Sequence, residues 1–217
     1  MNRDQTVRDV ILAKVQTALE AYAETPLEPP ASARFEPRTA AGPDGEMDLL
    51  LDEVRRLSGQ GRKVQGPDGF AVALEELVKA EHVRKASFSD HPLYRRYGLA
   101  ELLARLGVEI VPPASGRGEL AECDLGMTVA DGALPETGTV LLRTTKGQPD
   151  LLSLLPRVHL ALVTPDALLP DLHHAFALAK GDRHFVLVSG SSRTADIEKV
   201  LTLGAHGPKS FHLWICF

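Results

Sequence analysis

The sequence predicts an α/β fold in which a mainly parallel sheet is flanked by helices. The first observation is that short apolar runs alternate with helix-like segments from Glu46 onward. Such alternation is typical of parallel strands joined by helices that cover both faces of the sheet. The second is a chain of 217 residues with 44% hydrophobic and 24% charged residues, which is ordinary for one globular domain with a full core.

The amino-terminal part differs from the rest of the chain. Residues 4–22 place apolar side chains along one stripe of a helix. Residues 25–45 contain five prolines and two glycines, a composition typical of an extended connection. We therefore expect residues 1–45 to form an N-terminal helical arm with a Pro-rich connection, and residues 46–217 to form the α/β domain. The pattern leaves open whether the arm packs on the domain or on a partner.

The first part of the domain alternates helix with strand. Apolar residues at helical spacing predict helices over residues 47–59, 70–80 and 92–106. The segments that follow them are expected to be strands, at residues 62–65, 83–88 and 108–111. Two prolines, Pro112 and Pro113, end the last of these.

The second part begins with a different pattern. Residues 125–130 and 139–143 are β-like, and the turn-rich segment 131–138 lies between them. Antiparallel pairing here would add a hairpin-like insertion to the parallel sheet. The alternation then resumes with a strand at 158–163, a helix at 165–179, and strands at 185–188 and 211–217.

The stretch from Phe185 to Pro208 is the expected centre of the domain. Small residues follow the strand at 185–188, Thr194 is expected to cap a helix over 195–203, and Gly204 is expected to end that helix. A strand, a turn and a helix in this order would place a ligand-sized opening at the carboxyl end of a parallel sheet.

Two interpretations of this turn stay open. In the first, backbone N–H groups and the helix N-terminus hold an anion, and the candidate ligand-binding residues are Ser189, Gly190, Ser192, Arg193 and Thr194. In the second, the turn is an ordinary connection. Asp196 and Glu198 favour the second interpretation because their charges already complement the helix dipole and would repel an anion.

A second polar turn lies between the two β-like segments of the middle. It belongs to a polar cluster of Asp131, Glu136, Thr137, Thr139, Thr144, Thr145 and Lys146. Glu136 is the candidate catalytic residue, as a general base or as a nucleophile towards an acyl group, and Thr137, Gly138 and Thr139 are candidate ligand-binding residues. The alternative is a tight turn fixed by Pro135 and Gly138.

A third turn, residues 204–208, contains His206 between small residues. His206 is the second candidate catalytic residue, as a proton donor or acceptor. A ring that only fixes the turn by hydrogen bonds to the backbone is an equal alternative.

Composition and missing motifs exclude several classes of protein. The net charge of −5 gives no general electrostatic reason to bind nucleic acid or an anionic membrane. No apolar run approaches the roughly 20 residues that span a bilayer, and the amino end is polar, so we expect a cytoplasmic protein.

Cys123 and Cys216 belong to no C-x-x-C pair and cannot supply the thiolates of an iron–sulfur cluster. Histidine spacing predicts no metal site, and no dinucleotide, phosphate-loop or serine-hydrolase motif is present.

Five short motifs in this order resemble the lactate-utilisation protein C family, whose module is the LUD domain. The segments that carry the resemblance are Gly126–Ala130, Glu136–Thr139, Ser153–Pro156 with His159, Ser189–Glu198 and Gly204–Pro208. The sequence departs from the family pattern at two turns, with Ser191 where Pro is frequent and Pro135 where Ala is frequent.

The resemblance implies both a fold and a process. It implies the fold of ribose-5-phosphate isomerase, glucosamine-6-phosphate deaminase and the CoA transferases. It also implies a multi-protein system that oxidises L-lactate to pyruvate, with the iron–sulfur clusters on partner proteins and no cofactor in this chain.

The expected function is therefore that of an accessory subunit of this iron–sulfur system. It would bind a small anionic or acyl-type ligand between the turns at 136–139 and 189–194, with His206 nearby. The alternative is a stand-alone acyl-CoA or sugar-phosphate enzyme in which Glu136 carries the acyl group. A scaffold without a ligand is a third possibility. The sequence leaves the ligand, the oligomeric state and the presence of catalysis open.

Overall fold

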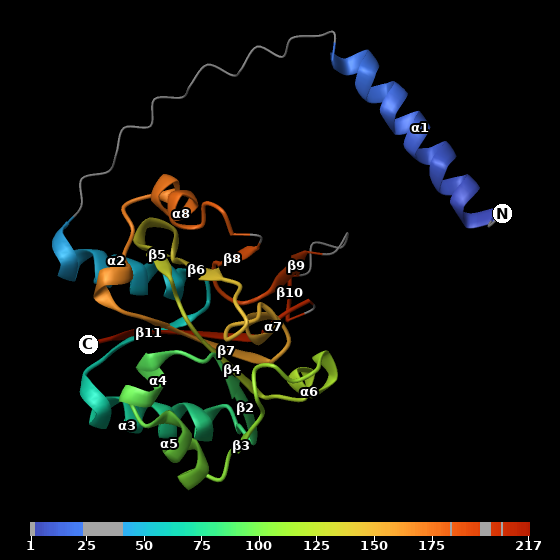
Figure 1. Ribbon diagram of the computed structural model, residues 1–217. Helices are drawn as coiled ribbons and strands as arrows, with labels where there is room; N and C mark the ends of the chain where they lie inside the picture. Colours follow the sequence, from blue (N-terminus) through green and yellow to red (C-terminus); the bar gives the residue numbers. More distant parts are fainter. Residues whose placement is uncertain (1–2, 24–40, 183, 196–200, 205) are drawn as a thin grey trace. The chain divides into compact units, whose positions relative to one another are not determined.

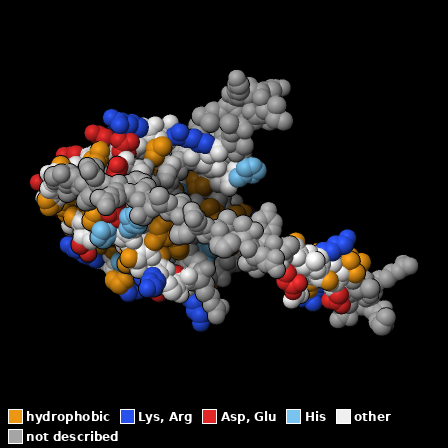
Figure 2. All heavy atoms as spheres, turned by 90° about the horizontal axis from the view of Figure 1, so that it is seen from above, with side chains coloured by type: hydrophobic (Ala, Val, Ile, Leu, Met, Phe, Trp, Pro, Cys, Tyr) orange, Lys and Arg blue, Asp and Glu red, His pale blue; other side chains and the backbone are white. Residues whose placement is uncertain are grey.

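The computed structural model describes residues 3–23, 41–182, 184–195, 201–204 and 206–217. Its contacts divide the chain into two units, Met1–Pro37 and Arg38–Phe217, each described by itself. In the first unit the structure describes one helix, α1 (Arg3–Ala23), which confirms the helix expected over residues 4–22. Apolar side chains of α1 such as Val7 and Ile11 are exposed. Figure 2 shows hydrophobic and charged side chains together on the surface of this helix.

Six strands form the main sheet of the second unit, in the spatial order β1-β11-β7-β4-β2-β3 (Figure 1). Every neighbouring pair is parallel. The strands are β1 (Gln60–Val64), β2 (Lys85–Phe88), β3 (Glu109–Ile110), β4 (Leu125–Val129), β7 (Val158–Val163) and β11 (Ser210–Cys216). Each overlaps a segment expected to be a strand, so the mainly parallel α/β fold is confirmed.

Three helices cover one face of the main sheet (Figure 1). They are α3 (Gly66–Ala80), α4 (Pro92–Arg96) and α5 (Leu99–Arg105). The core beneath them contains the ring of Phe70, which stacks on Tyr97 at 4.5 Å between centroids and meets the edge of Trp214 at 5.5 Å. The single helix expected over residues 92–106 is divided, because Gly98 adopts the left-handed conformation (φ 60°) between α4 and α5.

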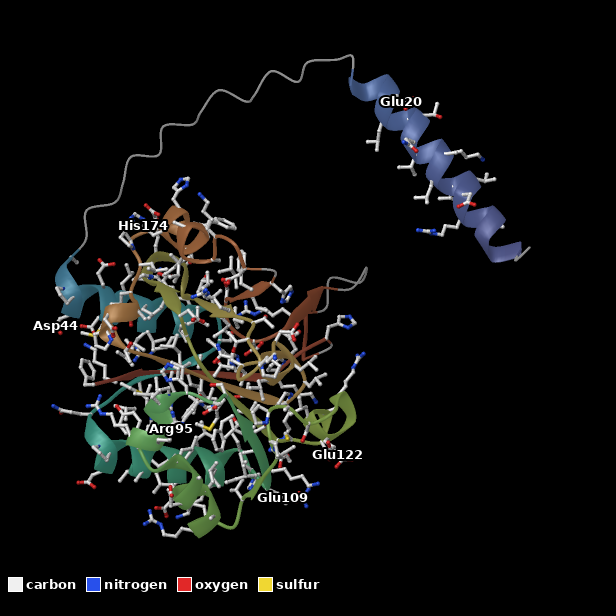
Figure 3. The ribbon with its side chains drawn as sticks, viewed as in Figure 1. Glu20, Asp44, Arg95, Glu109, Glu122 and His174 are labelled. Atoms are coloured by element: carbon white, nitrogen blue, oxygen red, sulfur yellow. The ribbon has the colours of Figure 1, made fainter. Side chains whose placement is uncertain are left out.

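The other face is covered by α2 (Gly42–Arg56) and by a second sheet. This sheet is antiparallel, in the order β5-β6-β8, with β5 (Gly132–Leu134), β6 (Thr139–Arg143) and β8 (Phe185–Val188). Its inner residues, such as Val140, pack against α2 and the main sheet. Its outer residues, such as Leu141, pack with Ala175 of α8 (Leu172–Leu178), the helix at the top of this unit in Figures 1 and 3.

The second sheet corrects two expectations. The hairpin expected between 125–130 and 139–143 forms instead between β5 and β6, because β4 belongs to the main sheet. β8 was expected to continue the parallel sheet, and it pairs antiparallel with β6. A four-residue apolar run defines a strand, but a strand partner is selected by long-range packing.

The helix expected over residues 195–203 is wrong. β9 (Arg193–Ala195) pairs antiparallel with β10 (Leu201–Leu203), with Thr194 opposite Thr202 in the register. Thr194 is therefore a strand residue and not a helix cap. β-branched residues such as Thr194 and Thr202 favour strands, and each of the two short segments gives the other a strand partner. Residues 196–200 lie outside the described part of the chain.

Short helices complete the second unit. The helix expected over 165–179 is shorter, because the 3₁₀ turn η2 (Pro165–Ala167) precedes α8. The remaining elements are η1 (Pro135–Thr137), α6 (Arg117–Ala121) and α7 (Leu151–Leu154). Within the described ranges, no helix has the length and apolar character needed to cross a membrane.

Candidate functional site

The two polar turns predicted to share a ligand meet at one end of the second sheet. Thr139 begins β6, and Ser189 directly follows β8. Because β6 and β8 are antiparallel neighbours, with Val140 opposite Val188, the start of one strand lies beside the end of the other. The Thr139 and Ser189 hydroxyl oxygens lie 2.7 Å apart, within hydrogen-bond distance.

A third hydroxyl extends this contact into a chain. The Thr137 and Thr139 hydroxyl oxygens lie 2.8 Å apart, and the Thr139 hydroxyl also lies 3.3 Å from the Thr137 carbonyl oxygen. Thr139 is buried, whereas Thr137 and Ser189 are exposed. The buried member is therefore held between two hydroxyls that remain accessible to a ligand.

These residues line a hollow of about 320 Å³, which we call the hydroxyl pocket. Its lining comprises Leu134, Glu136, Thr137, Thr139, Pro170, Asp171, Leu172, Leu187 and Ser189. Apolar walls and a few convergent polar groups are the usual composition of a small-molecule site. Three segments distant in sequence, around η1, after β8 and before α8, build it together.

The C-terminal part of α2 and the loop after it fix the backbone of both turns. Gly138 (φ 60°) and Gly190 (φ 86°) adopt the left-handed conformation that glycine tolerates best. A Cβ atom on Gly138 would lie 2.9 Å from the Glu53 carbonyl carbon, and one on Gly190 would lie 2.9 Å from the Leu57 carbonyl oxygen. Both glycines therefore permit a backbone approach that any side chain would prevent.

Two carboxylates border the hydroxyl pocket. Glu136 is exposed at its rim. Asp171 caps α8, accepting the His174 backbone N–H at 3.0 Å and lying 2.7 Å from His174 Nδ1. The hydrogen bond from the His174 side chain, followed by that from its backbone, lowers the pKa of Asp171. The pocket thus offers hydroxyl donors on one side and carboxylate acceptors on the other.

The other predicted site residues lie away from the hydroxyl pocket. Arg193 donates a hydrogen bond to the Leu57 carbonyl. Ser192 donates its N–H to the Pro208 carbonyl at 3.0 Å and accepts the Gly204 N–H at 2.9 Å. His206 is exposed on the same 204–208 turn and is not among the residues that line the pocket.

The expected anion site at a helix N-terminus has no helix to support it, because residues 193–195 form a strand. The side chain of Thr194 lies outside the described part of the structure. Of the residues expected to bind a ligand, Thr137, Thr139 and Ser189 line the hydroxyl pocket with Glu136, whereas Gly138 and Gly190 shape the backbone of its two turns.

The polar cluster recognised in the sequence is divided between two sites. Asp131 and Thr145 line a second hollow of about 450 Å³, which we call the edge hollow, where β2, β4 and β7 end. Sequence reasoning missed several of its residues, among them Ser89, Asp90 and Asp166. The sequence did carry a signal for them. A polar residue directly follows the last residue of two correctly predicted strands, Phe88 and Val163.

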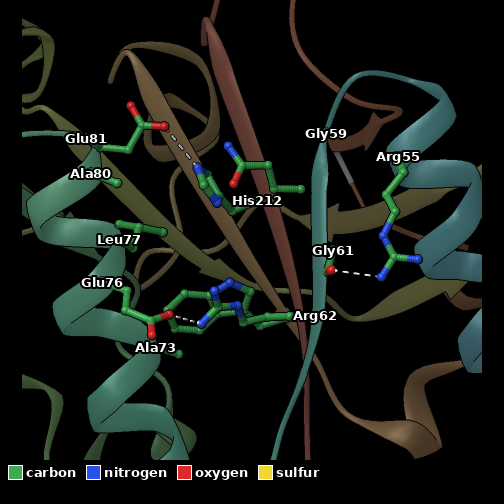
Figure 4. A pocket seen from close by; sticks show the side chains of 12 residues that line it. Arg55, Gly59, Gly61, Arg62, Ala73, Glu76, Leu77, Ala80, Glu81 and His212 are labelled. Atoms are coloured by element: carbon green, nitrogen blue, oxygen red, sulfur yellow. Dashed lines mark hydrogen bonds and ion pairs between the residues drawn. The ribbon is translucent and has the colours of Figure 1, made fainter.

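A third hollow, of about 320 Å³, lies at the amino ends of β1 and β11 (Figure 4). Glu81 Oε1 lies 2.7 Å from the Ser210 hydroxyl and 3.1 Å from His212 Nε2. Burial lowers the pKa of His212. Burial also acts on Glu81 and by itself would raise the pKa of that carboxyl. Hydrogen bonds from Ser210 and His212 outweigh this effect, so the pKa of Glu81 is lowered. The ion pair between Arg62 and Glu76, at 2.8 Å, crosses the same hollow. These groups bind one another, which is typical of a structural network.

No group of three metal-binding side chains with suitable geometry occurs among the residues that the structure describes. Burial raises the pKa of Cys123 to about 11 and that of Cys216 to about 12. Both thiols therefore stay protonated at neutral pH and act as apolar packing groups.

Comparison with known proteins places the chain in a family. The model of the LUD domain matches residues 114–215. Lactate utilization protein C of Halalkalibacterium halodurans is 32% identical over 188 residues, which cover 81% of this chain and 80% of that protein. Lactate utilization protein C of a Geobacillus species is 30% identical, with 93% and 92% of the two chains covered.

The fold has a counterpart among solved structures. A DUF162 family protein from Deinococcus radiodurans superposes with a TM-score of 0.61 at 16% identity, covering 82% of this chain and 100% of its own. Identity this low supports the fold alone. Together with the sequence matches, the result is that this chain belongs to the lactate utilization protein C family and carries its LUD domain.

Proposed function

We propose that this chain acts in lactate utilisation, as an accessory subunit of an iron–sulfur system that oxidises L-lactate to pyruvate. Its membership in the lactate utilization protein C family supports the process. The division of labour is supported by the two cysteines of the whole sequence, which are too few for a four-thiolate cluster. In this proposal the clusters belong to partner proteins and this chain supplies a binding site.

The hydroxyl pocket is the proposed ligand site, and the chain of Thr137, Thr139 and Ser189 is the observation that carries it. If each hydroxyl donates to the next one along the chain, the two hydrogen bonds use two of the three hydroxyl protons. The hydroxyl at the end of the chain, that of Thr137 or of Ser189, then keeps its proton to donate to a ligand. Glu136, at the rim of the same pocket, can only accept. One donor and one acceptor match a 2-hydroxy acid, whose carboxylate accepts and whose hydroxyl donates.

Charge limits which anions the pocket is expected to hold. Glu136 is solvent-exposed, so water screens its repulsion of a ligand carboxylate. Asp171 is already engaged by His174. A singly charged hydroxy acid therefore fits better than a phosphate, for which the lining residues supply no Lys or Arg.

Growth of a deletion strain tests the process. We expect cells without this gene, and without a paralogue, to grow poorly on L-lactate as sole carbon source and normally on pyruvate. The wild-type gene should restore growth, and the double variant T139V/S189A should not. The T144V variant is the matched control, because Thr144 is an exposed threonine just after the other end of β6 and does not line the hydroxyl pocket. Undiminished growth of the deletion strain would contradict the proposal.

A further inference from the structure

The edge hollow lies where the chain connections of the main sheet diverge. β2 and β4 are neighbours, yet β2 leads to β3 on one side while β4 leads to β7 on the other (Figure 1). In open α/β sheets, connections that leave neighbouring strands in opposite directions open a crevice at their carboxyl ends, and ligands bind there. The hydroxyl pocket belongs to the second sheet, so the edge hollow is a separate place.

The walls of the edge hollow are held by the Gln148 side chain, which hydrogen-bonds to the Val129 backbone, and by one hydrogen bond between backbone groups. Gln148 accepts the Val129 N–H at 3.0 Å and donates to the Val129 carbonyl at 3.1 Å, which fixes the loop after β6 against the end of β4. Asp90 donates its N–H to the Gly147 carbonyl at 2.8 Å, which joins the same loop to the end of β2. The hollow of about 450 Å³ is therefore formed before any ligand binds.

A buried hydroxyl on its lining makes no hydrogen bond of normal geometry to the residues that the structure describes. This is the hydroxyl of Ser89, which directly follows β2 and is only 1% exposed. Buried polar groups are normally hydrogen-bonded, so an unpaired one needs an explanation. Ser89 lines the edge hollow and also an adjoining hollow lined by Tyr94. The buried Tyr94 hydroxyl likewise makes no hydrogen bond of normal geometry in the described structure; burial raises its pKa, and the neighbouring Ser89 hydroxyl opposes that rise.

The charge of the edge hollow is negative. Asp131 and Asp166 line it, and neither has an ion-pair partner within 4 Å among the described residues. The cation on the lining, Arg143, is occupied by Asp182 through two hydrogen bonds of 2.6 and 3.0 Å. The third lining carboxylate, Asp90, pairs with Arg95 at 3.0 Å. Two carboxylates are left to meet a ligand.

Two further lining groups, His91 and Thr145, accept backbone N–H groups and keep a donor for a ligand. His91 uses Nδ1 to accept the Leu93 N–H at 3.2 Å. The Thr145 hydroxyl accepts the Gln148 N–H at 3.0 Å. A ligand that enters this hollow therefore meets hydroxyl and ring donors beside two carboxylates that have no ion pair among the described residues, so the charged ligand group that finds an opposite charge here is a cation.

We infer that the edge hollow is a second small-molecule site, distinct from the hydroxyl pocket, and that it takes a ligand carrying a primary amine and a hydroxyl. The amine lies between the Asp131 and Asp166 carboxylates. The ligand hydroxyl pairs with the buried Ser89 hydroxyl. Carboxylates and phosphates are rejected, because the site has no cation left to receive them.

Three probes of similar size and different charge test this inference: ethanolamine, ethylene glycol and glycolate. Each is titrated into the ¹⁵N-labelled full chain while amide shifts are followed. We expect saturable shifts at residues 89–91, 131, 164, 166 and 167, with ethanolamine binding about tenfold more tightly than ethylene glycol, as one charge interaction allows. Glycolate is expected to leave these amides unshifted.

Variants separate recognition from folding. D131N keeps an oxygen that can accept the Arg143 N–H seen at 2.8 Å, and with D166N it is expected to abolish the preference for ethanolamine over ethylene glycol. D68N, which neutralises an exposed carboxylate that does not line the hollow, is the matched control and should retain it. S89A should weaken binding of both hydroxyl-bearing probes several-fold while leaving the free protein equally or more stable.

Three results would overturn the inference. One is equal binding of all three probes, and another is glycolate binding most tightly. The third is the absence of saturable shifts at about 100 mM probe, which is above the millimolar dissociation constants expected of such small ligands. A preference for ethanolamine that survives D131N/D166N places the amine elsewhere and equally contradicts the assignment.

Discussion

The hydroxyl oxygens of Thr139 and Ser189 lie 2.7 Å apart, although the two residues are 50 positions apart in the chain. Antiparallel pairing of β6 and β8 produces this contact, and the backbone of α2 and of the loop after it confines the neighbouring glycines, Gly138 before Thr139 and Gly190 after Ser189. The contact therefore joins the start of β6 to the end of β8 in the wall of the proposed ligand site.

Removal of this contact should have a small but measurable effect on folding. T139V and S189A each delete one hydroxyl, and we expect a coupling energy of about 1 kcal/mol, the usual net value of one hydrogen bond. A double-mutant cycle in urea measures it. Coupling indistinguishable from that of the T144V/S189A pair would show that the two hydroxyls do not interact.

Alanine at Gly138 or Gly190 should cost much more. Each position combines a left-handed backbone with a close approach to the chain at residues 53–57. Gly107 (φ 72°) is the matched control, because a Cβ atom there would meet nothing within 4 Å. We expect G107A to lower the free energy of unfolding by about 1–2 kcal/mol. G138A and G190A should lose a further 1–3 kcal/mol or so by overpacking, measured by urea denaturation. Equal losses at all three positions would contradict the steric argument.

Acid should destabilise the protein through His159. This histidine is fully buried on β7, its Nε2 lies 2.9 Å from the Thr128 hydroxyl, and burial lowers its pKa from 6.5 to about 3. In the unfolded chain the His159 imidazole binds a proton below about pH 6.5, whereas in the folded chain it binds one only below about pH 3. The free energy of unfolding therefore falls as the pH drops through this window, by at most about 5 kcal/mol.

The variant H159Q removes the titrating group and keeps a polar partner for Thr128. Its free energy of unfolding should vary less between pH 6.5 and pH 4 than that of the wild type. H206Q is the control, because His206 is exposed. A pH dependence that H159Q leaves unchanged would assign the acid sensitivity to other groups.

Both cysteines should resist modification in the folded protein. Cys123 and Cys216 are 3% and 2% exposed, and burial raises both thiol pKa values. At pH 8 a disulfide reagent should react slowly with the native chain and rapidly with both thiols in denaturant. Fast stoichiometric reaction of either thiol in the native protein would show that its surroundings open readily.

Much of the fold was predictable because the main sheet follows local signals. The buried strand β7 matches the strand expected at residues 158–163 residue for residue. The segment 185–188 was also correctly predicted as a strand, but its sheet was not, because the choice of β6 as its partner depends on packing across the whole domain. The helix expected at 195–203 failed for the same reason, since β9 and β10 stabilise each other by pairing.

The candidate site was predictable in part. Glu136, Thr139 and Ser189 do line one pocket, as the order of the polar turns suggested. They meet through an antiparallel strand pair and not at the rim of the parallel sheet. Asp131 was grouped with them because it is close in sequence, yet it lies after β4 in the edge hollow. Asp131 and Glu136 are only a few residues apart in the sequence, but they line hollows at two different sheets.

The central claim is that the hydroxyl pocket recognises a 2-hydroxy acid, and titration of L-lactate into the purified full chain tests it most directly. We predict saturable calorimetric binding, at least several-fold weaker for propionate, which lacks the hydroxyl, and for the T139V/S189A variant. T144V should bind as the wild type does. Binding that does not distinguish L-lactate from propionate, or that survives loss of both hydroxyls, would contradict the claim.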